Sequence, residues 1–174
     1  MKFNAFAKSN VLAITVAIVA AMSAGAADAA LIERVYHQNA ANHCQGALPA
    51  FAGTLRARPL GVGNEGNAAA FLTCSFETSG QFEPINRLSV FFTNNNDAGS
   101  ITINCTGVFG VQRSTPVYLA KSVDVPSGAT GNLAWTETDN GGEALPGPGN
   151  ISCAMPPGSV MLDIFNYFNV EIGT

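Results

Sequence analysis

Short runs of alternating apolar and polar residues recur along the chain, separated by clusters of Gly, Pro, Asn and Asp. From Ala68 to Phe76 the apolar or small residues Ala70, Leu72, Cys74 and Phe76 fall on every second position. The run from Ser100 to Val108 alternates in the same way. Because successive side chains of a strand point to opposite faces, this period of two predicts half-buried β-strands.

Further runs of five to thirteen residues extend the pattern through the rest of the chain. The expected strands are 68–76, 87–93, 100–108, 116–125, 133–137, 151–155 and 160–172. We expect 87–93 and 100–108 to form a β-hairpin around the turn 94–99. A helix is considered for 29–41, and 47–66 is expected to hold edge strands or loops. The prediction is all-β, an antiparallel β-sandwich in one domain.

The N-terminal residues have the order of a secretory signal peptide. Lys2 and Lys8 precede the apolar run 11–22, which is shorter than the roughly 20 residues of a membrane-spanning helix. Small residues follow, and cleavage is expected after Ala26, with Ala29 as the alternative. This predicts a leader over 1–26, a mature domain over 27–174 without a transmembrane segment, and a secreted or periplasmic protein exported by the general secretory route.

All four cysteines lie beyond the predicted leader, at Cys44, Cys74, Cys105 and Cys153. An even count in an oxidising compartment indicates two disulfides, and four cysteines allow three pairings. We favour Cys44–Cys74 with Cys105–Cys153, because neighbours in sequence close the smaller loops. No two cysteines have the short spacing that would let them share a zinc ion.

Charged residues make up 11% of the chain, against about 25% in ordinary soluble domains. Beyond residue 26, six basic residues stand against twelve acidic ones, a net charge of −6. Such a chain has no electrostatic attraction to nucleic acid. Asn, Ser, Thr and Gly are abundant instead, so amides and hydroxyls are expected to solvate the surface.

Five short segments carry a resemblance. They are Cys44-Gln45-Gly46, Asn64-Glu65-Gly66, Ala70-Phe71-Leu72-Thr73-Cys74-Ser75-Phe76, Cys105-Thr106-Gly107-Val108 and Cys153-Ala154-Met155-Pro156-Pro157-Gly158. Together they resemble small, uncharacterised exported proteins of Gram-negative bacteria that keep four cysteines on a β-rich body. The resemblance implies export and disulfides, and it implies no activity.

The two histidines, His37 and His43, are the candidates for a metal site. Two imidazoles six residues apart can bind copper or zinc weakly. A metal site normally has three or four ligands, and Glu33 is the one carboxylate at a suggestive offset. Surface histidines are therefore the favoured reading, and no cofactor is expected.

No catalytic signature is present, and no catalytic residue is assigned. The chain has no G-x-S-x-G motif. The carboxylate pairs Glu77 with Glu83 and Asp139 with Glu143 have no more than chance spacing for glycoside hydrolysis. The oxygen-rich turns 94–97 and 139–143 do not match a calcium loop, and turn formation explains their Asn, Asp and Gly residues.

The leading hypothesis is a non-enzymatic binding or envelope-associated protein whose partner is an envelope or surface ligand. Arg56, Arg58 and Arg87 make up half of the mature basic residues, and the first two share a face if their segment is extended. They are candidates for holding an anionic sugar or a lipid headgroup. The alternatives are a small secreted hydrolase or carbohydrate-active enzyme, and a surface-assembly subunit joined by strand exchange.

Overall fold

The computed structural model describes residues 30–76, 78 and 84–172. Residues 32–170 form one compact unit, and residues 30–31 and 171–172 belong to a second one. These short segments are the ends of two strands. The predicted leader and both of its candidate cleavage positions lie outside the described residues.

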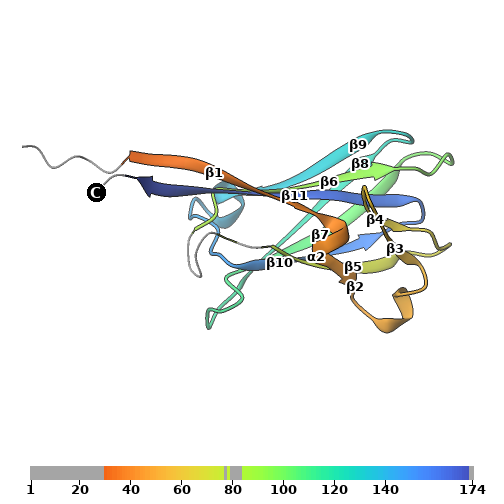
Figure 1. Cartoon of the computed structure of the whole chain (residues 1–174), viewed down its shortest axis with the longest axis horizontal. Coiled ribbons are helices and arrows are strands. Elements are labelled where there is room, and N and C mark those ends of the chain that lie inside the picture. The colour runs from red at the N-terminus through yellow and green to blue at the C-terminus, as the bar shows by residue number, and fades with distance from the viewer. Residues whose placement is uncertain (1–29, 77, 79–83, 173–174) are drawn as a thin grey trace, which may run out of the picture. The chain divides into compact units, whose positions relative to one another are not determined.

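Two antiparallel sheets make up the fold (Figure 1). The five-stranded sheet has the order β2 (Cys44–Gly46), β5 (Ala70–Phe76), β10 (Gly149–Met155), β7 (Ile101–Phe109), β8 (Val117–Val125). The six-stranded sheet has the order β3 (Leu55–Arg58), β4 (Gly61–Asn64), β11 (Ser159–Ile172), β6 (Arg87–Asn94), β9 (Thr130–Thr136), and β1 (Ala30–Asn39) also pairs with β11. The short helices are α2 (Ala40–His43), η1 (Pro49–Phe51) and η2 (Glu137–Asn140).

One hydrophobic core draws residues from both sheets. Strands β5 and β7 bury every second side chain, as their alternation predicts. Trp135 of β9 is fully buried, lies 6.5 Å from the ring of Phe109 on β7, and donates a hydrogen bond to the carbonyl of Leu119 on β8. The prediction of an antiparallel β-sandwich is confirmed.

The predicted hairpin of 87–93 with 100–108 is wrong. Strand β6 pairs with β11 and β9, whereas β7 pairs with β10 and β8, so the turn between them crosses from one sheet to the other. Alternation identifies a strand and its buried face, but it does not identify the neighbouring strand. Here the partners that complete each sheet come from far away in the sequence.

Two buried asparagines fasten the strand ends of one sheet to the other. Asn94 ends β6 and donates to the carbonyls of Gly99 and Val125, at 2.8 and 2.9 Å. Asn64 ends β4 and donates to the carbonyls of Ala68 and Met155, at 2.8 and 2.7 Å. In both cases the side-chain oxygen accepts from the backbone N–H two residues later. Asn94 therefore has a structural role at this crossover.

The segment considered for a helix is mostly a strand. Residues 30–39 form β1, and α2 has four residues. Nearly all of β1 is exposed, its apolar side chains included, and its pairing with β11 satisfies backbone groups that a helix would have satisfied internally. The irregular segment 47–66 contains η1 and the β3–β4 hairpin, which agrees with the expectation of edge strands or loops.

The cysteines form the favoured pairs, Cys44–Cys74 and Cys105–Cys153. The members of each pair lie directly opposite one another on adjacent strands, with Cα atoms 4.0 and 4.1 Å apart. Both disulfides therefore join neighbours within the five-stranded sheet, and the two sheets are held together by the core, by hydrogen bonds and by the ion pair of Lys121 with Asp139.

Candidate functional site

The face of the five-stranded sheet that points away from the core is rich in neutral polar groups, and we call it the polar face. Its residues come from all five strands, because each strand alternates between the core and this face. They are Gln45, Phe71, Thr73, Ser75, Asn104, Thr106, Val108, Tyr118, Ala120, Ser122, Asn150, Ser152 and Ala154.

The strand register places these side chains in rows that cross the sheet. The central row runs from Gln45 through Thr73, Ser152 and Thr106 to Ala120. With strands about 4.8 Å apart, five strands give a row of roughly 19 Å. The polar groups therefore form a continuous surface that is longer than a single small molecule.

Two hollows lie side by side on the polar face. One, of about 460 Å³, is lined by residues of α2, β2, β5 and β10, among them His43, Gln45 and Asn150. The other, of about 480 Å³, spans β5, β10, β7 and β8, with Asn104 and Ser152 in its lining. Their linings are neighbours, because Thr73 of the first pairs with Ser152 of the second, and we call the two hollows together the trough.

Hydroxyl and amide groups of the trough are available for a ligand. Within the part of the chain that the structure describes, the side chains of Thr73, Asn104, Thr106, Asn150 and Ser152 make no hydrogen bond to protein. The rigid backbone of the sheet nevertheless fixes their positions. Such preorganised donors and acceptors reduce the entropy that is lost on binding.

Two exposed aromatic side chains lie at opposite corners of the polar face. Phe71 on β5 is 50% exposed, and Tyr118 on β8 is 67% exposed. Phe71 rests against Phe51 of η1, with ring centroids 6.2 Å apart. Strand spacing and register place Phe71 and Tyr118 roughly 20 Å apart on a diagonal that passes over Ser152 and Thr106.

The polar face carries little charge. Lys121 on β8 contributes to the lining, but its ammonium group bonds Asp139, at 2.7 Å, and the carbonyl of Ala134. Asp124, at the end of β8, accepts a hydrogen bond from Thr102. Burial raises the pKa of Asp139, but hydrogen bonds from Lys121 and from the backbone of Thr136 outweigh it, and the pKa lies below its ordinary value.

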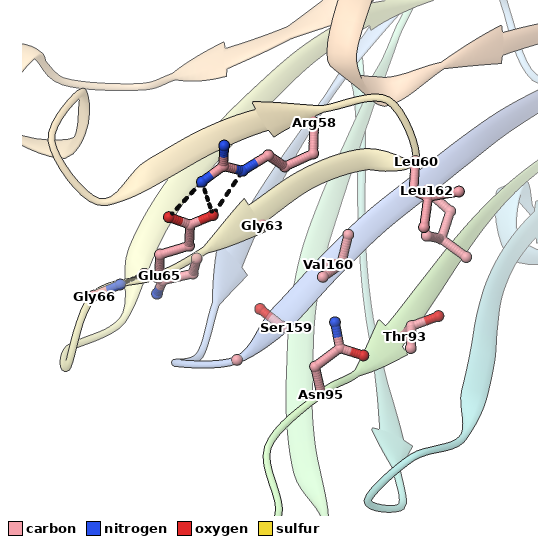
Figure 2. A pocket seen from close by; sticks show the side chains of 12 residues that line it. Arg58, Leu60, Gly63, Glu65, Gly66, Thr93, Asn95, Ser159, Val160 and Leu162 are labelled. Atoms are coloured by element: carbon pink, nitrogen blue, oxygen red, sulfur yellow. Dashed lines mark hydrogen bonds and ion pairs between the residues drawn. The ribbon is translucent and has the colours of Figure 1, made fainter.

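A third hollow, of about 460 Å³, lies on the six-stranded sheet beside the β3–β4 hairpin (Figure 2). Arg58 and Glu65 form one wall through a two-pronged ion pair, with nitrogen–oxygen distances of 2.9 and 3.0 Å. Val160 of β11 lies between that wall and Thr93, and Leu162 of β11 also lines the hollow. We call this hollow the hairpin cleft.

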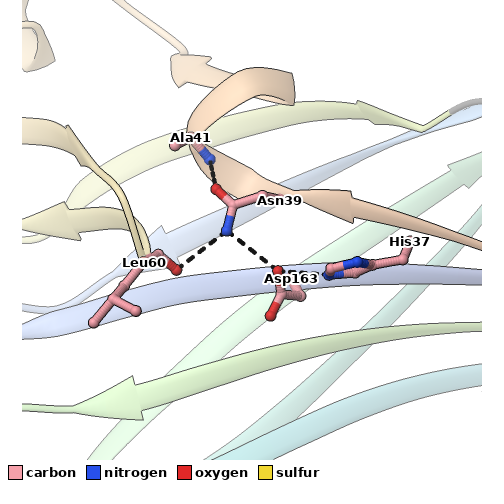
Figure 3. Close-up of polar contacts among 5 residues, drawn as sticks. All are labelled: His37, Asn39, Ala41, Leu60 and Asp163. Carbon is pink, nitrogen blue, oxygen red and sulfur yellow. Dashed lines mark hydrogen bonds and ion pairs between the residues drawn. The ribbon is translucent and has the colours of Figure 1, made fainter.

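The two histidines have separate partners. His37 on β1 stacks on Phe165 and bonds Asp163 at 2.9 Å, and Asp163 also accepts from Asn39 (Figure 3). His43 contacts the amide of Gln38 at 3.4 Å. Among the described residues, no group of three or more His, Cys, Asp or Glu side chains is placed to hold a metal ion.

The remaining carboxylates considered from sequence do not assemble into an acid–base pair. Asp139 caps η2 by accepting from the backbone of Thr136, and Glu143 is exposed at the following turn. Glu77 and Glu83 lie outside the described residues. In the turn 94–97, the oxygens of Asn94 and Asn96 accept backbone N–H groups, as turn formation predicts.

Sequence alternation identified part of the polar face and missed the rest. The alternation in 68–76 and 100–108 predicts that Thr73, Ser75, Asn104 and Thr106 point away from the core, because they lie between the apolar positions, and they do. Ser152 and Tyr118 were not associated with them, because the strand order that brings them together is not visible in the sequence. Exposed aromatics within alternating runs would have been the usable signal.

Comparison with known proteins gives the fold and nothing closer. No protein-family model and no curated protein matches the chain. A xylan-binding module, CBM15, is similar in fold, with 9% identity, a TM-score of 0.47, and coverage of 79% of this chain and 97% of that one. A CBM36 module in complex with calcium and xylotriose has 13% identity and a TM-score of 0.40, and the match covers 76% of this chain and 98% of that one.

A family 11 module from Clostridium thermocellum, in complex with a β-1,3-1,4-mixed-linked tetrasaccharide, is a further similar structure. It has 9% identity and a TM-score of 0.35, and the match covers 87% of this chain and 92% of that one. Likeness at these values concerns the sandwich fold alone. In the described residues, no helix has the length and hydropathy to cross a membrane.

Proposed function

We propose that the protein is a non-enzymatic binding protein whose polar face binds a neutral carbohydrate chain. The observation that carries this proposal is the neutral hydroxyl and amide surface across all five strands, with Phe71 and Tyr118 at two corners. The two disulfides are consistent with a protein outside the cytoplasm, where such glycans are met.

The hydrogen-bonding groups of the face suit a sugar. A hydroxyl both donates and accepts, and so do the side chains of Ser, Thr, Asn and Gln, so a sugar hydroxyl has a partner whichever way it turns. A ligand that covers this neutral face buries no protein charge, so the ligand does not need a charge of its own to compensate. The chemistry therefore favours a polyhydroxylated, uncharged ligand.

The aromatic groups suit the same ligand. The flat rings of Phe71 and Tyr118 offer apolar area to the C–H face of a sugar ring. Their separation of roughly 20 Å, estimated from strand spacing, exceeds the width of one sugar, so an oligomer is needed to reach both. This geometry favours a chain of several sugars over a monosaccharide.

The test measures binding of the mature protein to a panel of neutral polysaccharides by affinity electrophoresis and calorimetry. Xylan, the ligand in the name of one compared structure, is included in the panel. Phe71→Ala and Tyr118→Ala are each expected to weaken binding about tenfold, because each removes one aromatic contact. Leu60→Ala, which truncates a 75% exposed apolar side chain in the hairpin cleft, is the matched control.

If Leu60→Ala weakens binding to a neutral polysaccharide as much as Phe71→Ala does, the ligand does not bind specifically at the polar face. Absence of binding across the panel would remove the carbohydrate proposal. The hydrolase alternative would instead be indicated by release of reducing ends, which the same incubations reveal.

We also propose that the chain reaches its compartment by the general secretory route, with the leader removed after Ala26. The basic, apolar and small-residue order of the leader supports this. Mass spectrometry of envelope-fraction protein without reductant would give the mature N-terminus and the disulfide pairs together. A retained leader or four free thiols would contradict the proposal.

A further inference from the structure

The opposite outer surface, on the six-stranded sheet, differs in chemistry from the polar face. Its outward positions on β6 and β11 hold Phe91, Phe165 and Tyr167, and three of the protein's arginines lie around them. We call this surface the cationic strip, and it consists of Arg56, Arg58, Arg87, Phe91, Thr93, Val160, Phe165 and Tyr167.

The strand register sets the length of the strip. Arg56 pairs with Gly63, Gly63 with Val160, and Val160 with Thr93, so Arg56 lies level with the Thr93 end of β6. Arg87 lies at the other end of the same strand, six residues away, which is about 20 Å. Arg56 itself lies three strands, about 14 Å, across the sheet from Thr93, so Arg56 and Arg87 stand roughly 25 Å apart at the ends of a diagonal across the strip.

Arg87 is held in place with its hydrogen-bonding edge open. Its guanidinium lies over the ring of Tyr167, 3.9 Å from the centroid. Stacking uses the flat face of the guanidinium, so the N–H donors around its rim stay available for a carboxylate. Arg56 is exposed and has no hydrogen bond or ion pair to other described residues.

Two acids beside the strip already have partners. Glu65 is paired with Arg58, and Asp163 accepts from His37 and Asn39. Among the described residues, Arg56 and Arg87 have no ion-pair partner, in a chain whose formal net charge is −4. The strip therefore offers two guanidinium groups without an ion-pair partner among the described residues.

The middle of the strip is apolar and aromatic. Phe91 meets Phe165 edge to face at 5.4 Å, and His37 covers the β1 side of Phe165 with ring centroids 4.7 Å apart. Val160 continues this floor into the hairpin cleft. A ligand lying diagonally from β3 across β4 and β11 to the Arg87 end of β6 would therefore contact rings in the middle and guanidinium groups at the ends.

We propose that the cationic strip is a second binding site, for an acidic polysaccharide whose sugar rings carry carboxylates. Carboxylates match Arg56 and Arg87 in charge, and Arg87 in its two-pronged geometry. Sugar rings match the aromatic floor between them. A lipid headgroup offers one anion and no ring array, so it uses one end of the strip and leaves the floor unexplained. This site lies on the other sheet from the polar face, and the proposal does not depend on the function proposed above.

The test measures binding of the mature protein to polygalacturonate, with its fully methyl-esterified form as the uncharged counterpart. Polygalacturonate is expected to bind and the ester to bind at least tenfold more weakly. Arg56→Gln and Arg87→Gln should each weaken polygalacturonate binding about tenfold, because each removes a charge-assisted contact. Arg113→Gln is the matched control, since it removes the same charge from the loop between β7 and β8.

Three outcomes would overturn the proposal: equal binding of the ester, no binding of polygalacturonate, or equal loss in Arg113→Gln, which would indicate net charge alone. Binding to phosphatidylglycerol vesicles with the same arginine dependence and no polygalacturonate binding would assign the strip to lipid and also overturn it. Phe71→Ala separates the two sites, because it should weaken neutral-glycan binding and leave polygalacturonate binding unchanged.

Discussion

The two sheets share one core, but they differ in their covalent cross-links and in the chemistry of their outer faces. The five-stranded sheet contains both disulfides, pairs its long strands in unbroken register, and has a neutral polar outer face. The six-stranded sheet has no disulfide, its β11 shifts register between Met161 and Ile164, and its outer side carries arginines and aromatic rings. The comparison shows that one buried core can support two outer surfaces of different chemistry.

A physical reason connects the covalent bonds with the neutral surface. A trough of small hydroxyl and amide side chains contributes little packing of its own, so its shape depends on the strands beneath it. Cross-strand disulfides fix β2 to β5 and β7 to β10. The larger side chains of the cationic strip, by contrast, hold one another through ring contacts.

Removal of the disulfides should have the largest effect. Cys105→Ala with Cys153→Ala is expected to lower the free energy of unfolding by about 4 kcal/mol, since the closed loop spans 48 residues. Cys44→Ala with Cys74→Ala, spanning 30 residues, should lower it slightly less. Urea unfolding followed by the fluorescence of Trp135 measures both.

The Cys44–Cys74 variant also tests the division between the two surfaces. Loosening of the edge strand β2 should weaken neutral-glycan binding, because Gln45 and His43 line that end of the trough. Polygalacturonate binding should be retained at urea concentrations where the variant stays folded. Equal loss at both sites would show that the outer faces are not independent.

Truncation of Asn94 should have the next largest effect. Asn94→Ala removes two donated bonds and one accepted bond at a fully buried position, and it leaves the Val125 carbonyl without this donor. A loss of about 3 kcal/mol in the free energy of unfolding is expected. Asn95→Ala, at the exposed neighbouring position, should change stability by less than about 0.5 kcal/mol.

An Asn94→Ala variant as stable as Asn95→Ala would mean that the crossover between the sheets is held by the core alone. Asn64→Ala tests the same kind of link between the sheets, since Asn64 makes the equivalent hydrogen bonds at the end of β4. The two variants should lose similar amounts of stability.

The sequence predicted strands and their buried faces well, because alternation is a local property. Leu72, Ile103 and Phe92 are buried where the pattern places them. It failed on the partner of β6, since a turn rich in Asn and Asp suits a crossover between sheets as well as a hairpin. Pairing is decided by contacts between segments that lie far apart in the chain.

The candidate sites were less predictable for the same reason. Low charge indicated a surface of hydroxyls and amides, and Arg56 and Arg58 do share one face of β3, as expected if extended. The assembly of Thr73, Ser152 and Thr106 into one row depends on the order β5-β10-β7, which no local pattern contains. The stacking of Arg87 on Tyr167 likewise joins strands 80 residues apart in sequence.

Trp135 joins the sheets, and its replacement should have an intermediate effect. Trp135→Phe keeps an aromatic ring against Phe109 but removes the indole N–H that the Leu119 carbonyl accepts. A loss of about 2 kcal/mol is expected from the missing bond and the smaller ring. Calorimetry measures this loss of stability, because the variant lacks the tryptophan fluorescence used above. Tyr118→Phe, which removes an exposed hydroxyl, should not change stability.

The ion pair between Lys121 and Asp139 should give the smallest effect, and one that depends on pH. Lys121 belongs to the five-stranded sheet and Asp139 follows β9 of the six-stranded sheet, so the pair links the two. The pKa of Asp139 is lowered in the folded protein, because the bonds from Lys121 and Thr136 outweigh the opposing effect of burial. In the unfolded chain this carboxylate has the ordinary Asp pKa of about 3.9. As the pH falls, the unfolded chain therefore takes up a proton here before the folded protein does. The stabilisation is present above about pH 3.9 and disappears as the pH drops through the lower, folded-state pKa. Asp139→Asn should remove this part of the acid sensitivity below about pH 4, whereas Asp97→Asn, at an exposed turn, should leave it in place. Stability curves of the two variants that coincide across that range would show that the link between the sheets does not contribute to stability.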